Sequence, residues 1–115
     1  MSELLGIARF TFHSDKVDEF KRSSEKCLEI ARTEDTGTLQ YEIYLNADES
    51  EAIVIERYRD SDALIEHLGN IGDELMATMM STATVEGEVL GEPSPALRSM
   101  LDASPVRVLA PFRTL

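Results

Sequence analysis

Apolar residues recur in four short stretches of this chain that are typical of β-strands. In one of them the alternating residues Leu39, Tyr41, Ile43 and Leu45 predict a strand with one half-buried face. The predicted strands are Leu4 to Phe12, Leu39 to Leu45, the β-branched stretch around Ile53 to Ile55, and Thr82 to Leu90. In the first strand the alternation places Arg9 on one face and Phe10 on the other. The polar run Asn46 to Ser50 predicts a hairpin between the second and third strands.

Between these strands the apolar residues recur at helical spacing. Residues 15–33 predict one amphipathic helix. A second helix is expected to begin with Asp60 or Ser61 as its N-cap and to continue to the methionines near residue 80. The segment Gly69 to Gly72 interrupts its pattern, which predicts a kink or short loop beside His67.

The predicted order β-α-β-β-α-β is that of a ferredoxin-like α+β domain, which we place at residues 1–92. Ser94 followed by Pro95 has the form of an N-cap and a first-turn proline, so a short helix is expected over 95–102. Val106 to Leu109 has strand character and predicts a fifth strand. Residues 93–115 are therefore expected to be a helix-strand extension of the same domain.

The predicted strands carry apolar residues on both faces. Ile53 and Ile55 point to one side of their strand, while Ala52 and Val54 point to the other. Two helices cover only one face of a four-stranded sheet, so a second sheet is expected to cover the remaining face.

The composition fits one globular domain, with 115 residues, 43% of them hydrophobic, and a net charge of −11. That charge repels phosphate backbones and anionic lipids, so nucleic acid and membrane surfaces are not expected partners. No stretch is apolar enough to span a bilayer. The single Cys27 and the absence of a signal-peptide pattern over Met1 to Phe12 predict a cytoplasmic protein.

Four residues give the sequence its resemblance to a known family. Gly37 opens a strand, Glu56 and Tyr58 form an E-x-Y at the end of the next strand, and His67 follows that tyrosine by nine residues. This arrangement resembles the antibiotic biosynthesis monooxygenase family of small dimeric α+β barrels. The resemblance implies a homodimer, with residues 93–115 packing on the partner subunit. It also implies cofactor-free oxidation of a phenolic or quinol-like aromatic molecule by dioxygen.

His67 is the candidate general base, because an unperturbed imidazole titrates near neutral pH. Glu56 is its candidate helper, since a carboxylate among Ile and Val residues needs a partner such as His67 or Arg9. If Glu56 pairs with His67, the carboxylate fixes the tautomer of the imidazole. The plain alternatives remain open: a histidine that only packs, and a structural ion pair.

The candidate substrate-binding residues include Arg9 and two tyrosines. Arg9 or a tyrosine would stabilise oxyanion character on the substrate. Tyr41 and Tyr58 offer a hydroxyl group and a stacking surface, although a core role explains each equally well. Tyr41 and Tyr44 lie on opposite faces of their strand, so at most one of them lines the pocket.

Asn70 and Met76 complete the candidate site. Asn70 can hydrogen-bond a ligand carbonyl, and Met76 belongs to a methionine group able to line an adaptable pocket. Turn chemistry and core packing are the alternatives for them. The sequence has no glycine-rich nucleotide motif and no zinc motif, so neither a cofactor nor a metal is expected.

Three functions remain in competition. The first is the cofactor-independent monooxygenase, although the chain lacks the tryptophan that polyketide-oxidising relatives place in the pocket. The second is haem binding and degradation with His67 as the proximal ligand. It is disfavoured because the first strand lacks the asparagine of those relatives and the chain has no tryptophan. The third is a small-molecule binding or isomerising protein that consumes no dioxygen.

Overall fold

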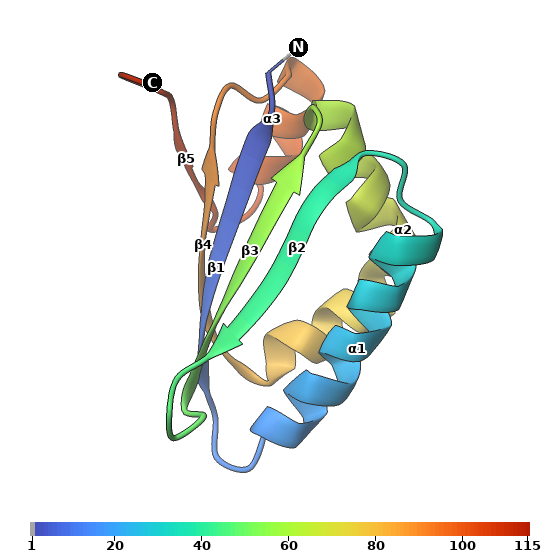
Figure 1. Cartoon of the computed structure of the whole chain (residues 1–115), viewed down its shortest axis with the longest axis vertical. Coiled ribbons are helices and arrows are strands. Elements are labelled where there is room, and N and C mark those ends of the chain that lie inside the picture. Colours follow the sequence, from blue (N-terminus) through green and yellow to red (C-terminus); the bar gives the residue numbers. More distant parts are fainter. Residues whose placement is uncertain (1) are drawn as a thin grey trace.

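The computed structural model describes residues 2–115. Met1 is the first residue of the segment expected to contain no signal peptide, and it lies outside the described residues. Its elements follow the predicted order (Figure 1). The strands are β1 (Leu4–Phe12), β2 (Thr38–Leu45), β3 (Glu51–Tyr58), β4 (Ala83–Leu90) and β5 (Arg107–Leu109), and the helices are α1 (Val17–Thr33), α2 (Ser61–Ser81) and α3 (Pro95–Asp102). The predicted ferredoxin-like α+β fold with a C-terminal helix and fifth strand is confirmed. Its pairing into a dimeric barrel stays a prediction.

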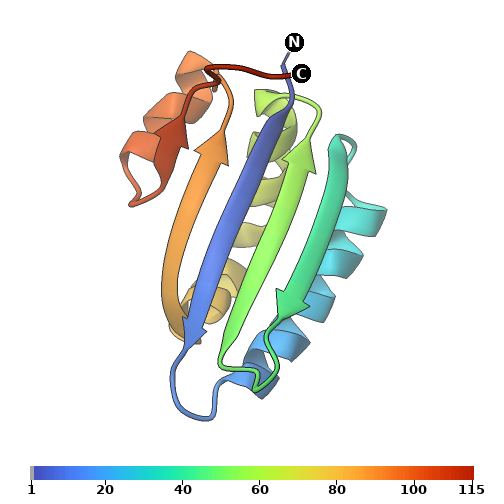
Figure 2. The same cartoon turned by 60° about the vertical axis from the view of Figure 1, so that its left-hand side comes forward.

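The strands form one sheet in the order β2-β3-β1-β4-β5. The first four strands pair antiparallel, and β5 runs parallel to β4. Figure 2 shows the sheet face-on with the helices behind it. We call the face that packs against the helices the inner face and the opposite face the outer face.

The inner face carries the core, because the alternating apolar residues of each strand meet the apolar stripes of the helices. One group of buried residues is centred on Phe10, Phe20 and Val54. A second group, at the other end of the sheet, is centred on Leu4, Tyr58 and Leu97. Burying one such side chain stabilises the fold by about 1.5–3 kcal/mol, so these two groups hold the helices on the sheet.

Helix α2 is capped and kinked as predicted. The Asp60 side chain accepts a hydrogen bond from the Ala63 backbone N–H at 2.9 Å. Gly72 has φ of 79°, a left-handed conformation that favours glycine, and it interrupts the helical geometry within α2. The bend comes just after the turn that carries His67, so α2 consists of two helical segments. In the part of the chain that the structure describes, no helix combines the length and hydropathy needed to cross a membrane.

Strand β2 departs from simple alternation at its start. The register shifts between Thr38 and Gln40, so Leu39 lies in a bulge and its surface is 53% exposed. Leu39 was expected to share a half-buried face with Tyr41, and this expectation was wrong, because an extra residue in a bulge turns its side chain out of the pleat. Beyond the bulge Tyr41 and Ile43 pack against the inner core as predicted. Leu45, expected on the same half-buried face, is 37% exposed at the end of the strand.

The C-terminal extension packs on its own chain. Ser94 caps α3 by accepting from the Leu97 backbone N–H, and Pro95 occupies the first turn, as predicted. Leu97 and Leu101 are buried beside α2, and β5 extends the sheet next to β4. Contact of residues 93–115 with a partner subunit stays a prediction.

Candidate functional site

A cavity of about 380 Å³ lies between the inner face of the sheet, α2 and α3. Its lining is mostly apolar, and it includes the carboxyl group of Glu56 and the imidazole of His67. Cys27 and His67 at one end are buried, whereas Met80 and Met100 at the other end are 43% and 44% exposed. We call the surroundings of His67 the buried end of the cavity, and the methionines Met80 and Met100 belong to its solvent-exposed side.

His67 is held by a carboxylate from the loop between α1 and β2. Its Nδ1 atom lies 2.6 Å from Oδ2 of Asp35, and both side chains are almost fully buried, at 3% and 0% exposed. Asp35 also accepts hydrogen bonds from Asn70 Nδ2 at 2.8 Å and from the Thr38 hydroxyl at 2.7 Å. Three donors thus surround one buried carboxylate.

These contacts determine the charge of Asp35 and the tautomer of His67. Burial alone would raise the pKa of Asp35, but the hydrogen bonds from Asn70, Thr38 and His67 outweigh it and lower this pKa. An ionised carboxylate only accepts hydrogen bonds, so Nδ1 of His67 carries the proton toward it. In the neutral ring the lone pair then lies on Nε2, which is the atom that can act as a base.

The loop that carries Asp35 is fastened to α2 at further points. Glu66 accepts hydrogen bonds from both the backbone N–H and the hydroxyl of Thr36. Gly37 is buried, and a Cβ atom there would lie 2.5 Å from the Cβ of Ala63. Only glycine allows the loop to approach α2 this closely. Asp35 is therefore positioned by the packing of the loop on the helix.

Glu56 faces His67 from strand β3. Its Oε1 atom lies 4.0 Å from Nε2, too far for a direct hydrogen bond, and it accepts one from the Tyr58 hydroxyl. Burial raises the pKa of Glu56, which favours its protonated form. Glu56, whose protonated form is favoured by burial, thus lies beside the Nε2 atom of His67 at the buried end of the cavity.

Two tyrosines frame the imidazole. The rings of Tyr41 and Tyr58 each lie 5.5 Å from the His67 ring between centroids. Burial raises the pKa of both phenols, so they remain neutral hydrogen-bonding groups. Burial likewise raises the pKa of the Cys27 thiol, which keeps it protonated and unreactive.

The structure brings most of the predicted site residues together. Tyr41, Glu56, His67 and Met76 line the cavity. Tyr58 and Asn70 lie behind this lining, where they hydrogen-bond Glu56 and Asp35. Tyr41 and Tyr44 were expected on opposite faces of β2, with at most one of them in the pocket. Tyr41 lines the cavity, whereas Tyr44 is 54% exposed.

Arg9 does not join this group. Its side chain is half-exposed and forms a 3.8 Å ion pair with Glu51. It borders a hollow on the outer face of the sheet rather than the cavity beside His67. The expected pairing of Glu56 with Arg9 is therefore not formed, because strand alternation puts the two side chains on opposite faces.

Sequence reasoning missed Asp35 and assigned its role to Glu56. Asp35 belongs to a short polar run, Glu34 to Thr38, that looks like a solvated connection. The one local signal is the glycine that follows two residues later, which marks a close approach of the backbone to another element. That signal does not indicate which side chain lies on the other side.

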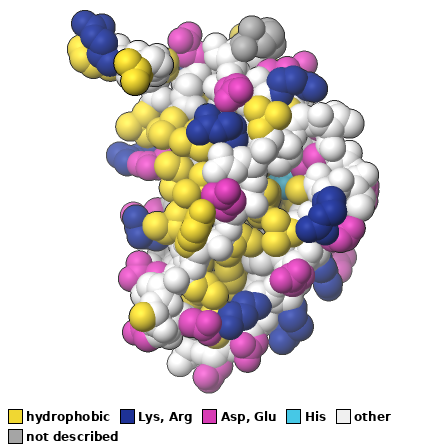
Figure 3. All heavy atoms as spheres, viewed as in Figure 1, with side chains coloured by type: hydrophobic (Ala, Val, Ile, Leu, Met, Phe, Trp, Pro, Cys, Tyr) yellow, Lys and Arg dark blue, Asp and Glu magenta, His cyan; other side chains and the backbone are white. Residues whose placement is uncertain are grey.

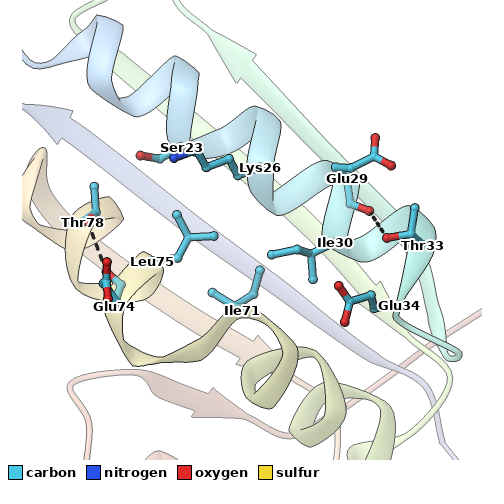
Figure 4. A pocket seen from close by; sticks show the side chains of 10 residues that line it. All are labelled: Ser23, Lys26, Glu29, Ile30, Thr33, Glu34, Ile71, Glu74, Leu75 and Thr78. Carbon is cyan, nitrogen blue, oxygen red and sulfur yellow. Dashed lines mark hydrogen bonds between the residues drawn. The ribbon is translucent and has the colours of Figure 1, made fainter.

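A second hollow of about 550 Å³ lies between α1 and α2 (Figure 4). Ile30, Ile71 and Leu75 point toward one another across it, while Lys26 and Glu29 belong to its exposed rim. Ile71 also lines the cavity beside His67, so it forms the partition between the two hollows. None of the residues that hold or face the His67 ring reaches this second hollow.

The geometry of the site requires no metal to position His67. Within residues 2–115, no three His, Cys, Asp or Glu side chains are grouped so as to hold a metal ion. The chemistry that this chain itself offers is proton transfer between Nε2 of His67, the Glu56 carboxyl and a ligand in the cavity.

Comparison with known proteins identifies the fold of this site. The model of the antibiotic biosynthesis monooxygenase family matches residues 5–75. MupZ from Pseudomonas fluorescens superposes with a TM-score of 0.84 at 22% identity, over 98% of this chain and 88% of that one. Rv0793 from Mycobacterium tuberculosis superposes with a TM-score of 0.67 at 28% identity, over 83% of this chain and 99% of that one. SnoaB, a cofactor-independent oxygenase from Streptomyces nogalater, superposes with a TM-score of 0.66 at 19% identity, over 82% of this chain and 96% of that one. The comparison with curated proteins gave no match.

Proposed function

Because the chain belongs to the antibiotic biosynthesis monooxygenase family, we propose that it is an enzyme in which His67 removes a proton from a small molecule held in the cavity. The observation that carries this proposal is the 2.6 Å contact between His67 Nδ1 and Asp35, which leaves Nε2 as a base beside the cavity. The relatedness of SnoaB, named a cofactor-independent oxygenase, supports a substrate that reacts with dioxygen once deprotonated.

Proton transfer in this arrangement places one cation between two anions. The substrate proton moves to Nε2 of His67, and its bonding electrons remain on the substrate. The resulting imidazolium lies between ionised Asp35 and the substrate anion. The protonated Glu56 donates a hydrogen bond to the developing oxyanion, and the buried setting strengthens both interactions.

The oxidation that we propose starts from this anion. A phenolic or quinol-like substrate that carries a methylene group conjugated to its ring donates four electrons to dioxygen, and this methylene carbon becomes a carbonyl. One oxygen atom enters the product and the other leaves as water, so the substrate itself is the reductant. The apolar cavity excludes bulk water from the oxygen-derived intermediate.

A second candidate function is proton transfer without dioxygen, as in an isomerisation. It is favoured by Glu56, whose raised pKa and 4.0 Å distance from His67 Nε2 place an acid beside the base. The base would take a proton from one atom of the substrate while the acid returns one to another. This reaction consumes no oxidant.

Oxygen uptake with a panel of hydroxylated aromatics and quinols tests the first function. His67→Ala is expected to lower the rate about hundredfold or more, because general-base catalysis contributes at least that much. His13→Ala is the matched control, since His13 is exposed beyond the end of β1. An unchanged rate in His67→Ala would refute the assignment of the base.

The same panel separates the second function from the first. Solvent-deuterium incorporation without oxygen uptake, lost in His67→Ala, would identify an isomerising enzyme. A Soret shift on hemin titration would instead favour the haem alternative.

We further propose that the protein works as a homodimer through the outer face. Figure 3 shows hydrophobic side chains along the sheet, interspersed with charged ones. Ile7 and Ile55 are paired across β1 and β3 on this face, and neither is covered by a helix. Near the C-terminus the side chain of Phe112 is 85% exposed and available to a partner. A cytoplasmic location remains the expectation from the single cysteine.

A further inference from the structure

We propose that the cavity selects a neutral substrate with a flexible aliphatic portion, which enters between Met80 and Met100 and brings its oxygen-bearing end to His67. This proposal rests on the proton-transfer function above. It defines the class of molecule that the same site accepts: an uncharged head, such as a phenol or alcohol, joined to an apolar chain.

The charges around the cavity oppose an anionic substrate. Among the described residues that line it, none is Lys or Arg. Asp35 is ionised behind His67, and a carboxylate or phosphate at the buried end would face it with no cation to compensate. An anion would also raise further the already raised pKa of Glu56. An uncharged oxygen instead accepts a hydrogen bond from Glu56 without this penalty.

The shape-determining side chains favour a flexible chain over a flat ring. All four methionines among residues 2–115 line the cavity, namely Met76, Met79, Met80 and Met100. Methionine has three rotatable bonds and adapts to irregular aliphatic ligands. The aromatic rings of the lining lie toward the sheet, from Phe10 and Tyr41, and the chain has no tryptophan. A planar head therefore fits near His67, and the remainder of the cavity suits methylene groups.

The entrance is identified by the change in exposure along the cavity. Met80 of α2 and Met100 of α3 are both more than two-fifths exposed, and the exposed residues Ser104 and Pro105 complete this end. The C-terminal extension thus supplies one wall of the mouth. A ligand that enters there passes the methionines before it reaches Glu56 and His67.

Binding of simple probes tests this selectivity without any turnover. Octanol, octanoate and naphthol are titrated against protein with isotope-labelled methionine methyl groups, whose NMR shifts report occupancy. Octanol is expected to bind about tenfold tighter than octanoate and than naphthol. Across hexanol, octanol and decanol the affinity should rise about fourfold per methylene until the cavity is filled. Octanoate binding as tightly as octanol, or naphthol binding more tightly, would overturn the proposal.

The entrance is tested by substitution of one exposed methionine. Met100→Trp is expected to weaken octanol binding about tenfold by filling the mouth. Leu39→Trp is the matched control, because Leu39 is similarly exposed but lies in the β2 bulge outside the cavity. Met100→Ala provides a second variant, with an expected severalfold loss of affinity from the missing apolar contact. Octanol binding unaffected by both Met100 variants would rule out this entrance.

These outcomes are independent of the proposed reaction. If neutral chains bind as expected but His67→Ala retains the full rate, the substrate class holds and the assignment of the base fails. If octanoate binds as well as octanol while His67→Ala is inactive, the base holds and the substrate class fails.

Discussion

Asp35 and His67 are 32 residues apart in the sequence, yet their contact determines what the site can do. The carboxylate accepts the Nδ1 proton, so the basic lone pair lies on the side of the ring that faces Glu56. Asn70 and Thr38 hold the carboxylate in turn. Asp35 is thus a positioning residue that acts through His67, whereas His67 and Glu56 face the ligand.

Asp35→Asn should lower the turnover rate about hundredfold or more, because a neutral amide neither enforces the tautomer nor stabilises the imidazolium. The acidic limb of the pH–rate profile should also move to lower pH, since the imidazolium loses its counter-ion. Steady-state kinetics across pH measure both effects. Asp73→Asn, an exposed position on α2, is the control. A lower rate with an unmoved acidic limb would show that Asp35 has only a structural role.

Glu56→Gln should make the fold more stable at neutral pH. The pKa of Glu56 is raised in the folded state by burial, so the native protein binds more protons than the unfolded chain above about pH 4.5. Stability is therefore lost as pH rises from the unfolded pKa toward the folded one. Urea unfolding at about pH 5 and about pH 8 measures the change, and the advantage of the variant should grow with pH.

The control for this measurement is Glu74→Gln, at an exposed position on α2. The stability difference between Glu74→Gln and the native protein should stay nearly constant across the same pH range. A constant difference for Glu56→Gln as well would show that its carboxyl group is ionised in both states.

At the scale of elements, the sequence predicts the strands and helices because each has one buried face. Alternation in β1 and helical spacing in α1 are direct consequences of that burial. The bulge at Leu39 escaped prediction, since its apolar side chain continued the alternating pattern of β2. Asp35 escaped it for a different reason: its partner depends on how the α1–β2 loop meets α2, and no local pattern encodes that contact.

Gly37→Ala tests the packing of this loop. The added Cβ would meet the Cβ of Ala63 at 2.5 Å, so we expect destabilisation by about 1–3 kcal/mol and a weakened Asp35–His67 contact. Gly69→Ala is the matched control, because nothing lies within 4 Å of a Cβ there. In an exposed helix position this change should stabilise by about 0.5–1 kcal/mol. Urea unfolding compares the two, and equal stability would show that the loop simply shifts away.

At the scale of the whole molecule, the sheet has one covered face and one that is not covered by helices. The sequence showed apolar residues on both faces of the strands, which predicted this arrangement. It did not give the register between strands, and without the register the distance between Arg9 and Glu56 could not be judged. The structure separates them onto opposite faces, so the site lies on the helix side alone.

The homodimer predicts that charge on the outer face disrupts assembly. Ile55→Asp should convert a dimer to a monomer, because a carboxylate buried between two sheets has no partner. Size-exclusion chromatography with light scattering measures the mass, and the native protein is expected at twice the mass of one chain. Ala77→Asp is the control, since Ala77 is exposed on α2. A monomeric native protein at micromolar concentration would contradict the prediction.

The bend at Gly72 divides α2 into two segments with different roles. The segment before it carries His67 and is tied to the α1–β2 loop through Glu66 and Asn70. The segment after it carries three of the methionines that line the cavity, Met76, Met79 and Met80. Substitutions in the second segment can therefore accumulate without disturbing the first. Directed evolution confined to the methionine positions offers a route to new ligand preferences on an unchanged reactive centre.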